Sequence, residues 1–228
     1  MRSAPTPPSE RGRTGDAKAG QGPATAGRVG PNAVIQVIAA LERTGLASVS
    51  PEIFLRAGVS QWLARPPAEM IDETGAAGLH YAVRTVLSPD QAAGVLTLAG
   101  TLTADYLLAN RIPRLARTIL GMMPSPLAAR RLVRAIDDHA WTFAGSGYFR
   151  GLSGNPTIVE ILGNPLCARD RDADLQSAAP DRTEGVCFWH AAVFQRLFAV
   201  LVSPSVRVRE VTCEARGGAC CRFEIVWS

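Results

Sequence analysis

The end of the chain reads VRVREVTCEARGGACCRFEIVW over residues 206–227, and this stretch decides the fold. Val206 and Val208 alternate with arginines, which is the pattern of a strand with one apolar face. A second short run of β-branched and aromatic residues, 221–227, follows the turn at Gly217-Gly218. Two such runs around a glycine turn predict an antiparallel hairpin as the last element of the protein.

Two runs upstream of this hairpin, 141–143 and 157–162, have the same strand character and are bounded by Gly, Pro or Asn. Residues 186–202 differ, because they are strongly apolar with a helical period. The C-terminal half therefore predicts an α+β fold in which an antiparallel sheet packs on helices.

The N-terminal half predicts helices. Residues 1–30 are rich in Pro, Gly and Ala, a composition that predicts a disordered tail. Helical periodicity begins at Pro31, and Ser88-Pro-Asp-Gln91 has the form of a helix start, with Ser as N-cap and Gln three residues later. Another helix is expected from Pro126 to about His139. We therefore expect a tail (1–30), a helical region (31–120) and an α+β domain (121–228).

Composition excludes several classes of protein. The 228 residues are 47% hydrophobic, enough to bury a core. The net charge of +4 comes with arginines that are scattered and have few aromatics between them, so no nucleic-acid partner is predicted. The N-terminus lacks an apolar secretory signal, and the longest apolar stretch, 95–109, is interrupted by polar residues. We expect a cytoplasmic protein that does not span a membrane.

The five cysteines favour metal ligation over a disulfide framework, because their number is odd and no export signal is present. Cys213 and Cys221 are equidistant from the hairpin turn, so a symmetric hairpin places their Cβ atoms about 4.5–5.5 Å apart. Both sulfurs could then bind one zinc ion at about 2.3 Å. A disulfide between the two, or burial as small apolar side chains, fits the spacing too.

Glu210 adds a carboxylate to the apolar face of the strand, where a charge requires a partner. Strict alternation, however, puts Glu210 and Cys213 on opposite faces. A site that contains both therefore requires the strand to bulge or end near Thr212.

These residues resemble a known signature. Cys187 followed by an apolar helix, then EVTC (210–213) and GGACCRFEI (217–225), is similar to the 4-vinyl-reductase domain family, including its closing Cys-x-Phe-x-Ile strand. Phenol-sensing transcription activators of this family bind zinc through a Cys, a Glu and two Cys at intervals of 23, 3 and 8 residues, and the same residue types recur here at the same intervals.

The resemblance implies a structural zinc ion held by Cys187, Glu210, Cys213 and Cys221, with Cys167 and Cys220 as non-ligands. Three thiolates and one carboxylate leave no open coordination position. Such an ion holds the last hairpin to the preceding helix and performs no chemistry.

Most aromatic residues lie in two segments, which supply the candidate ligand-binding residues His139, Trp141, Phe143, Tyr148, Trp189 and His190. Ordinary core packing is the alternative explanation for each of them. The resemblance supports His139, because phenol-sensing members of the family contact the ligand hydroxyl with a His near this position.

The whole-chain layout, with a helical region before DDHAWTFAGSG (137–147), most resembles family members of bacteriochlorophyll biosynthesis. The resemblance implies a magnesium-tetrapyrrole ligand and, from the family name, reduction of a protochlorophyllide vinyl group. A reductase needs a hydride source, but residues 145–151 have one residue too many for a dinucleotide loop, and no flavin motif is seen.

We therefore expect a tetrapyrrole-binding carrier or accessory protein and name no catalytic residue. The reductase itself, and a sensor or adaptor of the same family, are the alternatives. Homodimers or complexes with pigment-biosynthesis enzymes are the expected assemblies.

Overall fold

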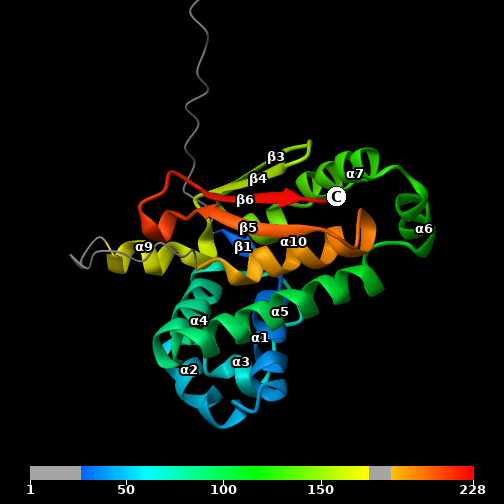
Figure 1. Cartoon of the computed structure of the whole chain (residues 1–228). Helices are drawn as coiled ribbons and strands as arrows, with labels where there is room; N and C mark the ends of the chain where they lie inside the picture. The colour runs from blue at the N-terminus through cyan, green and yellow to red at the C-terminus, as the bar shows by residue number, and fades with distance from the viewer. Residues whose placement is uncertain (1–26, 175–185) are drawn as a thin grey trace, which may run out of the picture.

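The computed structural model describes residues 27–174 and 186–228 (Figure 1). The first part is helical, with α1 (Asn32–Arg43), α2 (Ser50–Arg56), α3 (Gln61–Ala64), α4 (Glu73–Val86), α5 (Pro89–Asn110) and the 3-10 turn η1 (Ala47–Val49). A short antiparallel pair, β1 (Arg28–Val29) and β2 (Ile71–Asp72), accompanies these helices.

The second part combines helices and strands. Its helices are α6 (Arg114–Met122), α7 (Ser125–Asp138), α8 (Trp141–Ala144), α9 (Ala168–Asp174) and α10 (Phe188–Leu201), with 3-10 turns η2 (Pro165–Cys167) and η3 (Glu214–Arg216). Its strands are β3 (Tyr148–Leu152), β4 (Thr157–Leu162), β5 (Arg207–Thr212) and β6 (Cys221–Val226). The α+β class predicted from the sequence is confirmed, and β5 and β6 form the predicted hairpin.

The four strands form an antiparallel sheet in the order β3-β4-β6-β5. The inner face carries buried residues such as Phe149, Ile161 and Phe223. α10 lies between the sheet and α5, so the helical region and the sheet share one hydrophobic core (Figure 1). The outer face carries charged and exposed side chains, among them Arg150 and Arg209.

α5 is the central helix, and its start matches the prediction. Ser88 is the N-cap, Pro89 is the first helical residue, and the side chains and backbones of Ser88 and Gln91 form a reciprocal capping box. α5 is long and apolar enough to cross a membrane by length and composition. Its buried residues, from Ala92 to Leu108, nevertheless contact α1 and α10, which gives its apolar character a place in the core.

Two expectations need correction. Trp141–Phe143 is part of helix α8 and not a strand, because Phe143 bonds back to the Ala140 carbonyl and its ring packs on the rings of Phe149 and Phe194. The expected tail, 1–30, ends too late. Residues 1–26 lie outside the described residues, but β1 pairs with β2, and the Gly30 N–H donates to the Thr142 carbonyl at 2.6 Å.

Candidate functional site

Four buried cysteines meet where both ends of the β5–β6 hairpin approach the start of α10. Cys167 ends η2, Cys187 precedes α10, Cys213 follows β5 and Cys221 begins β6. Their Sγ atoms all lie within 4.8 Å of one another. The Sγ atom of Cys187 is 3.4 Å from that of Cys221 and 3.9 Å from that of Cys213, and Cys167 is 3.5 Å from Cys221.

A β-bulge places Cys213 in this group. Glu210 pairs with Phe223 and Thr212 pairs with Arg222, so Val211 is an extra residue on β5. The bulge that the sequence required near Thr212 is therefore confirmed. It shifts the alternation by one residue, and Cys213 reaches the same side of the sheet as Glu210.

The donors suit a tetrahedral metal ion. Sulfurs bound to zinc at about 2.3 Å lie about 3.8 Å apart in a tetrahedron, close to the separations seen here. Glu210 lies beside the cysteines but outside the 4.8 Å group. Its Oε2 accepts the backbone N–H of Cys187 at 3.0 Å, while its Oε1 is buried without a hydrogen-bond partner among the described residues. The structure thus offers two fourth donors, Cys167 and Glu210, beside Cys187, Cys213 and Cys221.

The electrostatics of this group also fit a cation. Hydrogen bonds from neighbouring thiols, that of Cys167 first, hold the pKa of the Cys213 thiol far below its usual range. Burial raises the pKa of the Glu210 carboxyl to about 8. A site that favours a thiolate and disfavours a lone carboxylate gains from a bound positive charge.

Residues outside the predicted set hold the cysteine loops in place. The buried Glu214 carboxylate accepts the backbone N–H groups of Gly163 and Asn164 at 2.6 and 2.9 Å and pairs with Arg171 at 3.0 Å. The Asn164 amide donates to the sulfur of Cys187 at 3.3 Å. No local pattern indicates these contacts, because 50 residues separate Glu214 from the Asn164 backbone that it holds.

Arg84 adds a buried ion pair behind Cys167. Its guanidinium pairs with Asp170 of α9 and donates to the Leu166 carbonyl at 2.8 Å. Because both partners are nearly inaccessible to solvent, this pair fixes η2, and with it Cys167, against α4.

Three of the six predicted ligand-binding residues come together behind the sheet. The His190 ring is 5.0 Å from the Trp189 ring and 6.1 Å from the Phe143 ring, measured between ring centroids. Phe194 and Phe223 complete the cage around it at 6.4 and 6.3 Å. We call these five residues the aromatic cage.

His190 is the unusual member of the aromatic cage. It is almost fully buried, and neither ring nitrogen has a hydrogen-bond partner among the described residues. The indole N–H of Trp189 is also buried without a partner in the same part of the chain. Burial lowers the pKa of His190 to about 3, so its imidazole is neutral at physiological pH.

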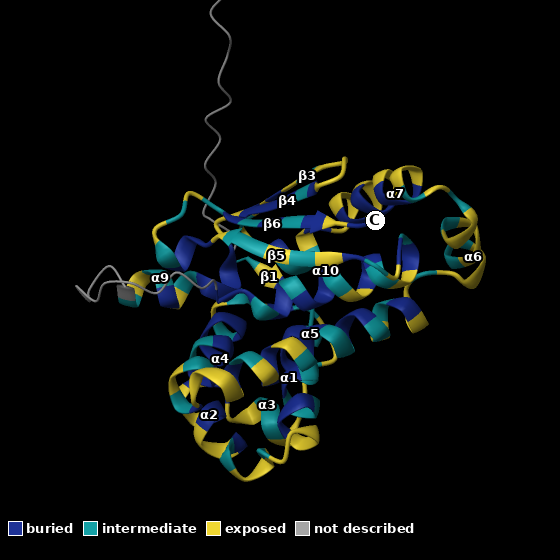
Figure 2. Cartoon of the chain, in the orientation of Figure 1, coloured by how far each residue is buried: buried dark blue, intermediate teal, exposed yellow. Residues whose placement is uncertain are grey.

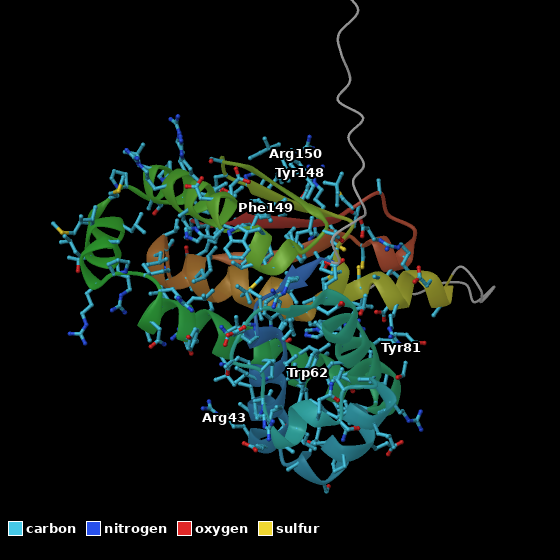
Figure 3. The ribbon with its side chains drawn as sticks, turned by 180° about the vertical axis from the view of Figure 1, so that it is seen from behind. Arg43, Trp62, Tyr81, Tyr148, Phe149 and Arg150 are labelled. Carbon is cyan, nitrogen blue, oxygen red and sulfur yellow. The ribbon has the colours of Figure 1, made fainter. Side chains whose placement is uncertain are left out.

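The other three predicted residues lie on the surface. His139 ends α7, and its Nδ1 lies 2.9 Å from the carbonyl oxygen of Ala135. Trp141 is 61% exposed on α8. Tyr148 is 64% exposed on the outer face of the sheet, and Figure 3 shows Phe149 on the opposite side. The structure therefore separates Tyr148 from the aromatic cage.

Cys220 also lies outside the cysteine group. It lines a hollow of about 430 Å³ on the outer face of the sheet, together with Tyr148, Arg150, Glu160 and Arg222. Arg150 and Arg222 both pair with Glu160, so this hollow is lined by neutralised charges.

We expect the protein to lose stability in mild acid because His80 is buried in its neutral form. Burial first, and then the charge of Arg84, lowers the pKa of His80 to about 3. An unfolded His titrates near about 6.5, so the stabilisation is complete above that pH and is lost as the pH falls toward 3. At about pH 5 the free energy of unfolding should be lower by about 2 kcal/mol for this residue.

Urea unfolding at neutral pH and near pH 5 tests this expectation. His80→Gln keeps an N–H that can reach the Ala33 carbonyl, which His80 Nε2 approaches at 3.0 Å, but it does not titrate. The variant should therefore lose about 2 kcal/mol less than the unchanged protein on acidification. Equal losses in the two proteins would contradict the assignment.

Comparison with known proteins agrees with the resemblance found in the sequence. The model of the 4-vinyl-reductase domain family matches residues 171–226. The chain is 45% identical over 207 residues to the bacteriochlorophyll synthase 23 kDa chain of Cereibacter sphaeroides, an alignment that covers 90% of this chain and 93% of that protein. It is 41% identical over 196 residues to the protein of the same name in Rhodobacter capsulatus, with coverage of 86% and 85%. The chain therefore belongs to the family of 4-vinyl-reductase-domain proteins that includes the bacteriochlorophyll synthase 23 kDa chains.

Proposed function

We propose that the protein acts in bacteriochlorophyll biosynthesis as a tetrapyrrole-binding carrier or accessory protein. Its relatives in C. sphaeroides and R. capsulatus are named as chains of bacteriochlorophyll synthase, and they match this chain over most of their length. The ligand in this proposal is a magnesium-tetrapyrrole intermediate, which combines flat apolar faces with a central cation.

The observation that carries the proposal is the imidazole of His190 within the aromatic cage, which has no partner in the described part of the chain. A buried polar group without a partner costs free energy, and folded proteins rarely leave it uncompensated. A neutral imidazole nitrogen is a good ligand for a metal cation such as the central magnesium. The rings of Phe143 and Trp189 can contact the apolar faces of a macrocycle.

Access to His190 would be from the side of α8. Phe143 covers the imidazole from this four-residue helix, and Trp141 of the same helix is exposed to solvent. α8 ends at Gly145, whose positive φ of 56° turns the chain sharply. A ligand that displaces the Phe143 ring would replace one apolar contact with another while it reaches His190.

We further infer that Cys187, Glu210, Cys213 and Cys221 hold a structural zinc ion. Sulfur separations near the tetrahedral value support this set, and so does Oε1 of Glu210, which has no partner among the residues described. The ion would supply folding free energy and no chemistry, because all four positions would be filled by the protein. It would fix Cys187 at the start of α10, the helix that carries Trp189 and His190.

Binding without reduction is the form of the proposal because of the segment nearest to a dinucleotide loop. Residues 145–151 lead from α8 directly into β3 and not into a helix whose N-terminus could hold a pyrophosphate. The alternative, a vinyl reductase, predicts turnover in the same assay.

Titration of the purified protein with divinyl protochlorophyllide tests the proposal. The absorption bands of the pigment should shift and saturate at one pigment per chain. His190→Ala should weaken binding by about ten-fold or more, as expected for loss of a buried ligand contact, and His190→Gln should recover part of it. Tyr148→Ala is the matched control, since Tyr148 lies outside the aromatic cage and should not change the affinity.

Two results would overturn the proposal. Failure of the folded, metal-containing protein to bind any magnesium-tetrapyrrole would favour the sensor or adaptor alternative. Monovinyl product at many turnovers per protein after addition of NADPH, with or without flavin, would establish the reductase.

A further inference from the structure

Residues 106–136 form an unusually basic part of the chain. They contain six arginines and no Asp, Glu or Lys. These six charges exceed the net charge of +4 of the whole chain, so the remaining residues together are net acidic. No ion pair joins any of the six arginines to another residue within 27–174 and 186–228. The arginines are 111, 114, 117, 130, 131 and 134.

The same segment exposes long apolar side chains in a stripe along α6. Leu115, Ile119 and Met122 are 71%, 51% and 82% exposed, and their spacing of four and three residues puts them on one face of the helix. α6 has no buried residue at all. Leu127 continues the exposed apolar surface at the start of α7.

The position of α6 leaves this stripe uncovered. α6 lies at one edge of the molecule, away from the α1–α4 bundle (Figure 1), and Figure 2 shows it with exposed and intermediate residues only. An exposed stripe of large apolar side chains is costly in water and is typical of an interaction surface.

We propose that α6 and the N-terminal part of α7 dock on the surface of an anionic lipid bilayer. A helix with an apolar stripe flanked by arginines lies in the interface of a membrane, with the stripe among the acyl chains and the guanidinium groups at the lipid phosphates. Leu115, Ile119 and Met122 supply the stripe, and Arg111 and Arg114 flank it.

A bilayer fits these side chains better than a protein partner does. The exposed part of α6 carries, apart from its arginines, a single polar side chain, Thr118, and its hydroxyl is bonded to the helix's own Arg114 carbonyl. The surface therefore offers charge and apolar area but little directional hydrogen bonding, which suits fluid lipid. This inference does not depend on the identity of the bound pigment.

Co-sedimentation of the full-length protein with vesicles tests it. Vesicles that contain phosphatidylglycerol should bind the protein about ten-fold more strongly than vesicles of phosphatidylcholine alone, and salt should weaken this binding. Ile119→Glu should reduce it by about ten-fold or more, because the variant puts a negative charge into the apolar stripe. Arg130→Glu with Arg131→Glu should reduce it by a similar factor.

Matched controls lie elsewhere on the surface. Leu55→Glu changes a Leu that is 70% exposed on α2, and Arg43→Glu changes an exposed Arg on α1. Both should bind vesicles with less than about two-fold change, and melting curves should show all variants folded, since no changed side chain is buried. No binding of the unchanged protein to anionic vesicles at low salt would overturn the proposal and leave an acidic protein as the occupant. Equal losses in the controls would overturn the assignment to α6.

Discussion

Cys221→Ser is expected to release the zinc ion and to lower the free energy of unfolding by about 5 kcal/mol or more. Zinc binding by structural sites contributes on the order of 10 kcal/mol to folding, which is comparable to the whole stability of a domain. Cys221 begins β6 and lies within 3.5 Å of two other sulfurs, so its loss opens the centre of the site. Elemental analysis and urea unfolding of the purified variant measure both effects.

Cys220→Ser is the matched control for this experiment. Cys220 is the adjacent residue but is partly exposed, and it lines the outer hollow instead of the cysteine group. Its replacement should leave zinc content and stability unchanged. Zinc-free protein in the unchanged chain, handled under reducing conditions, would show that the group of thiols is an ordinary part of the core.

The fourth ligand is decided by a second pair of variants. With Glu210 as ligand, Glu210→Gln should weaken zinc binding by about ten-fold to 100-fold, whereas Cys167→Ser should retain the ion. Metal loss in Cys167→Ser together with retention in Glu210→Gln would replace Glu210 by Cys167 in the ligand set.

Local patterns predict much of this architecture because they depend on neighbours in the chain. The alternation of Val208 and Arg209 predicts β5, and the mismatch between Glu210 and Cys213 predicts its bulge. The Ser88 cap predicts the start of α5 for the same reason, since its hydrogen bonds reach only three residues along the chain.

The parts that escape prediction depend on contacts between distant residues. Cys167 joins the cysteine group because η2 is held by Arg84 and Glu214, and no periodic pattern indicates those contacts. Tyr148 and Phe149 are neighbours in an aromatic stretch, but the alternation of β3 puts them on opposite faces. Their separation follows only once β3 is located at 148–152, whereas the sequence pattern places the strand at 141–143.

Gly100→Ala is expected to destabilise the protein by about 2 kcal/mol or more, although alanine is the better helix former. A Cβ atom at Gly100 would lie 2.3 Å from the carbonyl oxygen of Trp189 and 2.8 Å from the Cβ atom of Ala192. These atoms belong to the backbone and first side-chain carbon of α10, so the clash is relieved only if the two helices separate. Separation would also displace Trp189 and His190 from the aromatic cage.

Gly94→Ala on the same helix should have the opposite effect. A Cβ atom at Gly94 meets no described neighbouring atom within 4 Å, so the substitution should stabilise the protein by about 0.5–1 kcal/mol through helix propensity alone. Urea unfolding of both variants measures the difference in sign, and titration with divinyl protochlorophyllide measures whether Gly100→Ala also weakens binding. Stabilisation of similar size in both variants would mean that α5 and α10 are not in close contact at Gly100. Destabilisation at Gly100 with unchanged pigment affinity would place the ligand away from His190, because α10 cannot move at Trp189 without moving the imidazole that follows it.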